Sequence, residues 1–577
     1  MKYPSKITSN LHSFVLSLVA IFMICLPSIW QLEHFMRGNW SMIFLFTLSY
    51  TGLIVCLYKK TSLQFTSIDL FFTLWICWCG IRFFTSNTPT PDTGILLESL
   101  GLCLWYLFLR ANDQTRNILL VFIPAGICQA ITGILQHGGL IASRNTYFTF
   151  TGSFENPGPY GGFLAMTFLI TITYAWSHWH HFPLKQKIIA LTTLVILFYS
   201  LVGSNSRASW LAIIVGILYF LHARLHHSHK FQWCITGCII TLFTGIALFF
   251  FRPDSATGRL QIWQVAIKIY QEVPIIGHGI DSFPATYMNA QAEYLNNNTN
   301  TLNKYLASNN TYAFNEFIRI ACEQGCIGLI LFCTLLLALF LPPTTTARGK
   351  IAKTTLGGFF VFACFSYPAE ILPLKIIFIS LIATIANDAK PVYTLHTHRN
   401  VTYKFTGIII GICLVPVILE YKSRIDIDQK LHSLSISTNK TPDTLLQKHY
   451  NKYKFCKDFI LAYSHILYHA QKYKEALPLL EQAALLQPSI DILCDLGNCH
   501  AQQGNFDNAQ HCFKQATRMV PCYLMPRYQL FCLYKEHNKT DLAKSIAQEI
   551  LALKPKITNS TTLSIKKIVR TWCKNNS

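Results

Sequence analysis

The strongest constraint on the fold is a series of apolar segments that alternate with short polar loops through the first 420 residues. Most approach the roughly 20 apolar residues that a helix needs to cross a bilayer. Only 13% of the chain is charged, against about 25% in soluble proteins. We therefore expect an all-α fold, a polytopic transmembrane bundle of about 12–13 spans, because the shorter segments can merge or form half-helices. The segments cover residues 11–30, 41–58, 67–85, 94–110, 117–135, 158–177, 187–203, 208–222, 233–251, 314–341, 354–369, 373–387 and 405–421.

The basic residues set the expected orientation. Lys and Arg outnumber Asp and Glu by 48 to 27, and they gather in every second loop. Cytoplasmic loops carry this excess in membrane proteins, so the N-terminus, with Lys2 and Lys6, is expected in the cytoplasm. The opposite loops hold chiefly Arg37, Arg144 and Arg207. Because the basic residues are scattered rather than clustered on one face, no nucleic-acid partner is expected.

This orientation places loops 136–158, 203–207, 252–313 and 369–373 on the outer, periplasmic face. We expect a transmembrane domain at 1–425, with 252–313 as its large periplasmic loop. Several polar residues in or beside the spans also gather at this face. Such residues are functional candidates, although Glu98 could equally pair with an Arg to hold helices together. The residues are Glu98, Gln129, Gln136, Glu370 and Lys375.

The C-terminal region is amphipathic and repetitive, and it is expected in the periplasm. Small alanines recur at equivalent places, and a proline closes each unit, with spacings of 33 and 34 residues between units. This period is typical of tetratricopeptide (TPR) repeats. We expect a small TPR-like α-solenoid at 440–575 whose concave surface can dock a protein partner. The alanines are Ala476, Ala509 and Ala543, the prolines are Pro488, Pro521 and Pro555, and Gly504 permits a turn.

Two outer loops carry groups suited to anions. Asn156-Pro157 makes a tight entry into the next span and leaves backbone amides free at a helix N-terminus, which favours an anion; a simple turn would look the same. Arg207 follows in a hairpin between two spans. Its planar guanidinium suits phosphate, or it could reach lipid headgroups.

The large loop and the following span carry the remaining motifs. Arg259 and Trp263 are four residues apart and share one helix face. A turn follows, with His278 between Gly277 and Gly279. The stretch that starts at Tyr312 then enters the next span, with a polar stripe near its outer end: Asn315, Glu316, Arg319 and Glu323.

In order and topology, residues 120–340 resemble the O-antigen ligase (Wzy/WaaL-type) family of membrane glycan ligases and polymerases. The family has an Asn-Pro turn, an SR-x3-L hairpin, a loop with Arg-x3-Trp and Pro-x2-Gly-x-Gly, then His-Asn-x2-Leu and Glu-x-Gly-x2-Gly. The family's loop histidine would fall at Phe314 or Tyr312, so it is absent here. The matching residues are Asn156-Pro157, Ser206-Arg207 through Leu211, Arg259 with Trp263, Pro274-Gly277-Gly279, Asn315 with Phe317-Ile318, and Glu323-Gly325-Gly328.

The resemblance implies an inverting, metal-independent glycosyltransferase of the bacterial inner membrane that needs no cofactor. Its donor would be an undecaprenyl-diphosphate-linked glycan, with the diphosphate between Arg207 and Arg259 and the lipid among the helices. His278 or Glu316 would replace the missing histidine as the base. The substrate-binding residues would be Asn156, Trp263, Tyr312, Asn315, Arg319 and Glu323.

The acceptor stays open. Lipid A-core would make the protein an O-antigen ligase, a growing glycan would make it a polymerase, and a protein would make it an O-oligosaccharyltransferase. A non-enzymatic alternative is a membrane-anchored TPR assembly factor for cell-surface glycan. The histidine-rich stretches at 177–181 and 222–230 have no acidic or Cys partner beside them, so no metal site is expected.

Overall fold

The computed structural model describes most of the chain after residue 33. The predicted span at 11–30 lies outside the described residues, apart from Cys25. The described residues are 25, 34–36, 38–58, 62–86, 92–111, 118–224, 230–251, 253–297, 301–344, 346–396, 401–436, 444–556 and 558–575.

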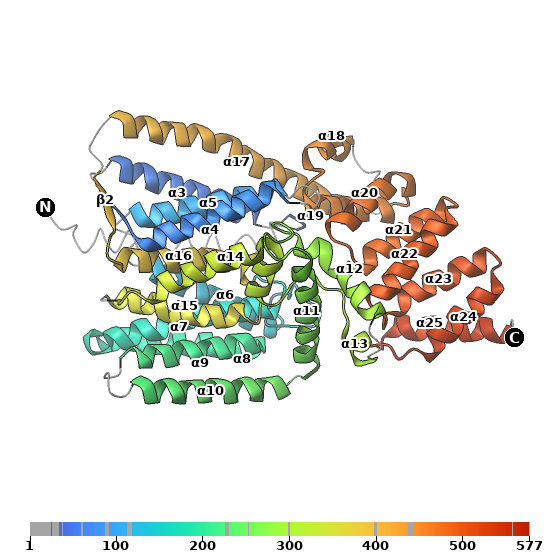
Figure 1. Ribbon diagram of the computed structural model, residues 1–577, viewed down its shortest axis with the longest axis horizontal. Coiled ribbons are helices and arrows are strands. Elements are labelled where there is room, and N and C mark those ends of the chain that lie inside the picture. Colours follow the sequence, from blue (N-terminus) through green and yellow to red (C-terminus); the bar gives the residue numbers. More distant parts are fainter. Residues whose placement is uncertain are drawn as a thin grey trace.

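A bundle of long helices, aligned with the long axis of the molecule, forms one half of the structure (Figure 1). The helices coincide with the predicted apolar segments. They are α3 (Asn39–Tyr58), α4 (Ser67–Phe84), α5 (Thr93–Ala111), α6 (Phe122–His137), α7 (Pro157–His178), α8 (Leu184–Ser204), α9 (Arg207–His222), α10 (Lys230–Phe251), α14 (Glu316–Phe340), α15 (Ala347–Ala363), α16 (Leu372–Asp388) and α17 (Val401–Ile436).

By length and composition, five helices among the described residues can cross a membrane, or six if one bent pair counts as a span. Others fall short: α9 has 16 residues, and α15 and α16 have 17 each. The multi-pass, helical class of the protein is therefore confirmed, whereas the number of 12–13 spans stays a prediction.

Helix α7 lies at the centre of the bundle and packs against α6, α8, α9 and α15. Most of its side chains are buried on all sides. Its second turn needs glycine, because a Cβ on Gly162 would lie 2.3 Å from the ring of Phe362. The apolar all-round pattern of this segment thus reflects a helix that is surrounded by protein.

Two short strands depart from the all-α expectation. β1 (Ser62–Phe65) pairs antiparallel with β2 (Tyr393–His396), with Ser62 opposite His396. They lie at the end of the bundle away from the C-terminal helices (Figure 1). Four-residue strands in short loops leave no periodic pattern for the sequence to show.

At the other end, the chain turns sharply out of the bundle. Helix α11 (Pro253–Glu272) follows α10 after a bend of 105°, so it runs across the ends of the bundle helices (Figure 1). Proline is tolerated at a helix start because its missing N–H needs no partner there. Two further helices, α12 (Phe283–Asn296) and α13 (Thr301–Leu306), complete the large loop.

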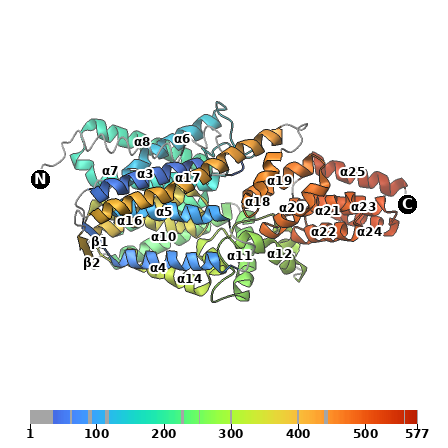
Figure 2. The same cartoon turned by 90° about the horizontal axis from the view of Figure 1, so that it is seen from above.

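The C-terminal helices stack in successive pairs beyond the large loop (Figures 1 and 2). Ala476, Ala509 and Ala543 are fully buried at equivalent positions, and Gly504 takes a φ of 78° at its turn, as expected. The assignment to the tetratricopeptide class stays a prediction. The helices are α18 (Thr444–Tyr453), α19 (Lys457–His469), α20 (Tyr473–Leu486), α21 (Ile490–Gln502), α22 (Phe506–Met519), α23 (Leu524–Glu536), α24 (Thr540–Ala552) and α25 (Ser560–Asn575).

The large loop and the first C-terminal helices share one apolar core. Tyr287 and Met288 of α12 are fully buried in the same cluster as Met519 and Val520. The side chain of Gln291 adds a polar link, because its amide donates to the carbonyl oxygen of Met519 at 2.8 Å. The C-terminal helices therefore hold the large loop in place.

Candidate functional site

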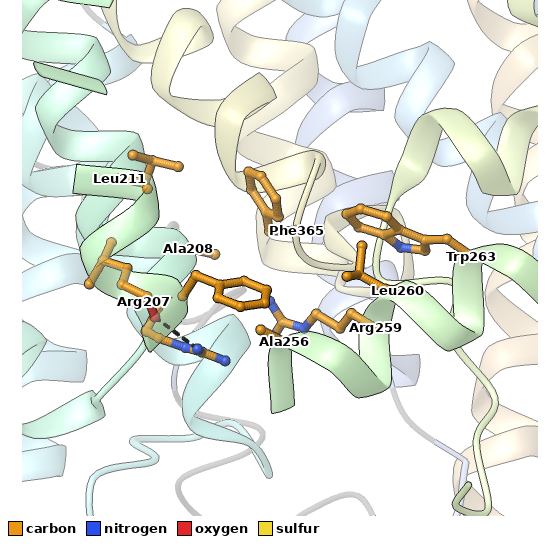
Figure 3. Close-up of a pocket in the computed structure, with 11 residues that line it drawn as sticks. Arg207, Ala208, Leu211, Ala256, Arg259, Leu260, Trp263 and Phe365 are labelled. Carbon is orange, nitrogen blue, oxygen red and sulfur yellow. Dashed lines mark hydrogen bonds between the residues drawn. The ribbon is translucent and has the colours of Figure 1, made fainter. Parts of the chain in front are cut away.

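A cleft between α9, α10 and α11 brings two predicted arginines together. Arg207 starts α9, and Arg259 and Trp263 project from α11 (Figure 3). The remaining walls are mostly apolar and include Leu211 and Phe365. The space amounts to about 610 Å³ with its open mouth included. We call this space, lined by Arg207, Ala208, Leu211, Gly245, Leu248, Phe249, Ala256, Arg259, Leu260, Trp263 and Phe365, the arginine cleft.

The two guanidinium groups are held differently. Arg207 donates to the carbonyl oxygen of Leu248 at 2.9 Å and to the hydroxyl of Ser255 at 3.0 Å. Arg259 lies over the ring of Phe314, 5.2 Å from its centre. Among the described residues, Arg259 makes no hydrogen bond or ion pair. Its donors are therefore available to a ligand.

The electrostatics of the arginine cleft favour an anion. Burial, together with the neighbouring positive charge of Arg207, lowers the pKa of Arg259 to about 10. Arg259 stays cationic at neutral pH. No carboxylate is found among the described residues that line this cleft. An anion between the two arginines would relieve their repulsion, and the guanidinium fork suits a phosphate.

An apolar groove continues from the arginine cleft along the bundle. It shares Leu211, Gly245, Phe249 and Phe365 with the cleft and extends past Thr241 of α10. The cleft and groove together pair a cationic end with a long apolar wall. This arrangement suits an amphiphile with an anionic head.

Phe314, which contacts Arg259, also lines a small aromatic pocket. Tyr312 stacks on Tyr367 with ring centres 4.1 Å apart, and Phe314 meets Tyr367 edge-on at 5.3 Å. Phe314 has a φ of 50°, which is rare for a bulky residue and often marks a functional site. The aromatic pocket also contains Asn315, Glu316, Arg319, Glu323 and Glu370.

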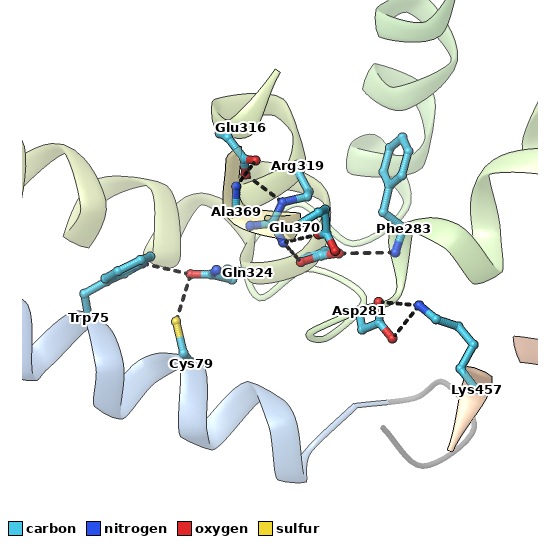
Figure 4. Close-up of polar contacts among 11 residues, drawn as sticks. Trp75, Cys79, Asp281, Phe283, Glu316, Arg319, Gln324, Ala369, Glu370 and Lys457 are labelled. Atoms are coloured by element: carbon cyan, nitrogen blue, oxygen red, sulfur yellow. Dashed lines mark hydrogen bonds and ion pairs between the residues drawn. The ribbon is translucent and has the colours of Figure 1, made fainter. Parts of the chain in front are cut away.

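Arg319 organises the acidic side of the aromatic pocket (Figure 4). Its guanidinium contacts Glu316 and Glu323 at 2.7 Å each and Glu370 at 3.8 Å. The second oxygen of Glu316 accepts from the backbone N–H of Ala369 at 3.0 Å. Asn315 caps α14, because its side chain accepts from the N–H groups of the next turn. The polar stripe predicted at the start of this span is thus one connected network.

The glycine motifs form a backbone clasp rather than an open loop. The N–H of His278 donates to the carbonyl oxygen of Cys322 at 2.9 Å, and the N–H of Cys326 donates to that of Pro274 at 2.8 Å. Gly325 interrupts α14 with a φ of 68°, and a Cβ there would lie 2.2 Å from the Ile275 carbonyl oxygen. We call residues 274–279 and 322–327 the glycine clasp. It fastens the end of α11 to the broken helix α14.

His278 belongs to the glycine clasp and lines neither the arginine cleft nor the aromatic pocket. Its Nε2 lies 2.9 Å from the carbonyl oxygen of Ile269 and 3.6 Å from a carboxylate oxygen of Glu272. Arg82, which sequence reasoning missed, supports the same turn by donating to the carbonyl oxygen of Gly277 at 2.8 Å. The role of His278 as the base stays a prediction, and its contacts indicate a positioning role.

The other predicted polar residues lie at the same end of the molecule. Asn156 caps α7 by accepting from the N–H of Gly158 at 3.0 Å. Glu98 does form an ion pair, but its partner is Lys375 of α16 and not an arginine. Gln129 and Gln136 bind the loop before Asn156 through hydrogen bonds to residues 151–153. These glutamines hold the loop in place.

Three aromatic residues at the site were missed as functional candidates: Phe314, Phe365 and Tyr367. Phe365 and Tyr367 come from the α15–α16 connection, which carries no motif. Only its predicted position on the outer face could have pointed to them.

Among the described residues, no three His, Cys, Asp or Glu side chains lie close enough to hold a metal ion.

The bundle of apolar helices defines a multi-pass membrane protein. Residues 192–333 match a family model described as O-antigen ligase, which supports that family for this protein. The match runs from α8 to α14 and includes both arginines of the arginine cleft, the glycine clasp, and Arg319 with Glu316 and Glu323. No curated protein matches the chain.

Proposed function

We propose that the protein transfers a glycan from a polyprenyl-diphosphate donor to an acceptor hydroxyl at the periplasmic face of the bacterial inner membrane. The observation that carries this proposal is the arginine cleft with its apolar groove. The diphosphate would lie between Arg207 and Arg259, and the polyprenyl chain would follow the groove between α9 and α10.

The proposed step is a single inverting displacement. The acceptor oxygen forms a bond to the anomeric carbon while the bond from that carbon to the diphosphate oxygen breaks. The diphosphate leaves with the electron pair, and the two arginines stabilise its charge in a water-poor cleft. The hydroxyl proton passes to a base. Of the two candidates, Glu316 lies in the aromatic pocket beneath Phe314, whereas His278 lies in the glycine clasp.

Replacing either arginine tests the proposal. We expect Arg207→Ala and Arg259→Ala each to lower the transfer rate about 100-fold or more, which is the usual effect of removing one group that stabilises a developing negative charge. The measurement is transfer by purified protein in lipid with a polyprenyl-diphosphate-linked glycan, alongside analysis of surface glycans in a complemented deletion strain.

Arg224→Ala is the matched control, because Arg224 follows the opposite end of α9 and packs on Phe220 there. Its transfer rate should stay within twofold of the native rate. Native surface glycans in both cleft variants would exclude the enzymatic proposal and favour the assembly-factor alternative. Short chains that are still attached to their acceptor would indicate a polymerase rather than a ligase.

A further inference from the structure

A second and larger cavity lies within the bundle. It occupies about 1220 Å³, open mouth included, between α4, α5, α14, α15 and α16. Helix α4 packs along α14, whereas α5 packs along α3 and α16. The cavity fills the space between these two groups of helices. We call it the second chamber; none of its lining residues lines the arginine cleft.

The second chamber is divided along its length. Its deep part is apolar and aromatic, with side chains such as Phe72, Phe332 and Phe378. Its outer part is charged and lies near the aromatic pocket, because Glu316, Arg319 and Glu370 line both spaces. A ligand that fits this division has an apolar tail at membrane depth and a polar head at the boundary.

The charges distinguish the second chamber from the arginine cleft. Four carboxylates and two cationic side chains line it: Glu98, Asp281, Glu316, Glu370, Arg319 and Lys375. Lys375 pairs with Glu98, and Asp281 pairs with Lys457 of α19. Arg319 is shared by Glu316, Glu323 and Glu370, so carboxylates still outnumber cations here. A phosphate would meet an excess of negative charge here. Carboxylate oxygens instead accept hydrogen bonds from hydroxyl groups.

We infer that the second chamber binds the glycan acceptor as an amphiphile whose headgroup is a hydroxyl-rich saccharide without phosphate. The identification of the bound amphiphile as the acceptor rests on the proposed function. The binding itself does not depend on that function. The saccharide would lie at the outer end, beside Glu370 and Arg319, and its hydroxyl would enter the aromatic pocket. Donor and acceptor would thus reach Phe314 from two separate spaces.

A photoactivatable alkyl maltoside serves as the probe, with the full-length protein in lipid nanodiscs and no glycan donor. We expect saturable labelling of α4, α5 or α16. Excess dodecyl maltoside should prevent this labelling, and dodecyl phosphate should compete at least tenfold less effectively. Labelling that does not saturate, or that both competitors prevent equally, would overturn the inference.

Ser99→Trp fills the chamber from its exposed side on α5, because Ser99 lines it. We expect labelling to fall at least tenfold. Leu100→Trp is the matched control, since Leu100 is the next residue of α5, is 45% exposed and does not line the chamber. It should label within twofold of the native protein. Equal labelling of the two variants would contradict the inference.

Glu370→Gln keeps the shape of the chamber and removes one negative charge. The preference for dodecyl maltoside over dodecyl phosphate should fall at least threefold, and an unchanged preference would refute the charge argument.

Transfer assays separate the two proposals. Loss of transfer only in the arginine variants, with native transfer and labelling in Ser99→Trp, would reject the chamber alone. Specific labelling with native transfer in Arg207→Ala and Arg259→Ala would reject the proposed function alone.

Discussion

At the scale of single residues, Phe314 connects the two sides of the site. It is one of the two positions, with Tyr312, at which the resemblance would place a histidine, and it holds a φ of 50°. Its ring lies under Arg259 and against Tyr367. A phenylalanine cannot accept a proton, so its contribution here is to orient Arg259 through the face of its ring.

Substitution at Phe314 tests this role. Phe314→Leu removes the ring face, and a cation–π contact contributes about 0.5–2 kcal/mol depending on desolvation. We expect kcat/KM for the polyprenyl-diphosphate donor to fall about fivefold, which corresponds to about 1 kcal/mol. Phe314→Tyr keeps the ring and carries a similar penalty for positive φ, so it should stay within twofold. Equal losses in both variants would assign the effect to the backbone.

At the scale of elements, the glycine clasp explains why two separate glycine motifs occur in one chain. Gly277 and Gly325 both have positive φ. A Cβ added to either glycine would lie within 2.5 Å of the backbone of the other segment of the clasp. Both allow two backbone segments to approach closely and form hydrogen bonds.

Gly325→Ala should break the glycine clasp. A Cβ 2.2 Å from the Ile275 carbonyl oxygen forces the segments apart, and overpacking of this kind costs about 1–3 kcal/mol. We expect the variant to unfold at a lower temperature in detergent, as measured by scanning calorimetry or fluorescence. Gly357→Ala in α15 is the control, because a Cβ there meets nothing within 4 Å. Its stability should be equal or higher, since alanine favours a helix by about 1 kcal/mol over glycine.

At the scale of the whole molecule, the C-terminal helices are part of the site's support. Lys457 of α19 forms an ion pair at 3.1 Å with Asp281, which lines the second chamber. The carbonyl oxygens of Lys304 and Leu306 in α13 accept from Cys522 and Lys556. Contacts on both sides of the loop thus fix its position relative to the bundle.

The Asp281–Lys457 pair offers a test of this coupling. Lys457→Met leaves Asp281 without its cation, and breaking a buried pair costs about 3–5 kcal/mol. We expect about 2 kcal/mol in urea unfolding, because 22% and 18% of the two side chains remain exposed. The double variant Asp281→Asn with Lys457→Met should recover at least half of the loss. Additive losses would mean that the pair does not couple the two regions.

Sequence patterns predicted the helical bundle and the meeting of Arg207 with Arg259. Apolar periodicity and the distribution of Lys and Arg act along the chain, and they place loops on a common face. The same patterns could not separate the arginine cleft from the aromatic pocket, because Phe365 and Tyr367 come from a connection without a motif. Nor could they show that the glycines pack on each other, since a turn and a close backbone approach require the same residue.

The length of the apolar groove carries a consequence for substrate choice. From Phe249 back to Thr241, the groove follows nine residues of α10, or about 12 Å for the eight steps at 1.5 Å each. A polyprenyl chain is several times longer than this, so only the first isoprene units next to the diphosphate would touch protein, and the remainder would lie in the bilayer. The protein would therefore be insensitive to the tail length of its donor. It would accept glycan donors with short synthetic polyprenyl chains as readily as donors with long natural chains.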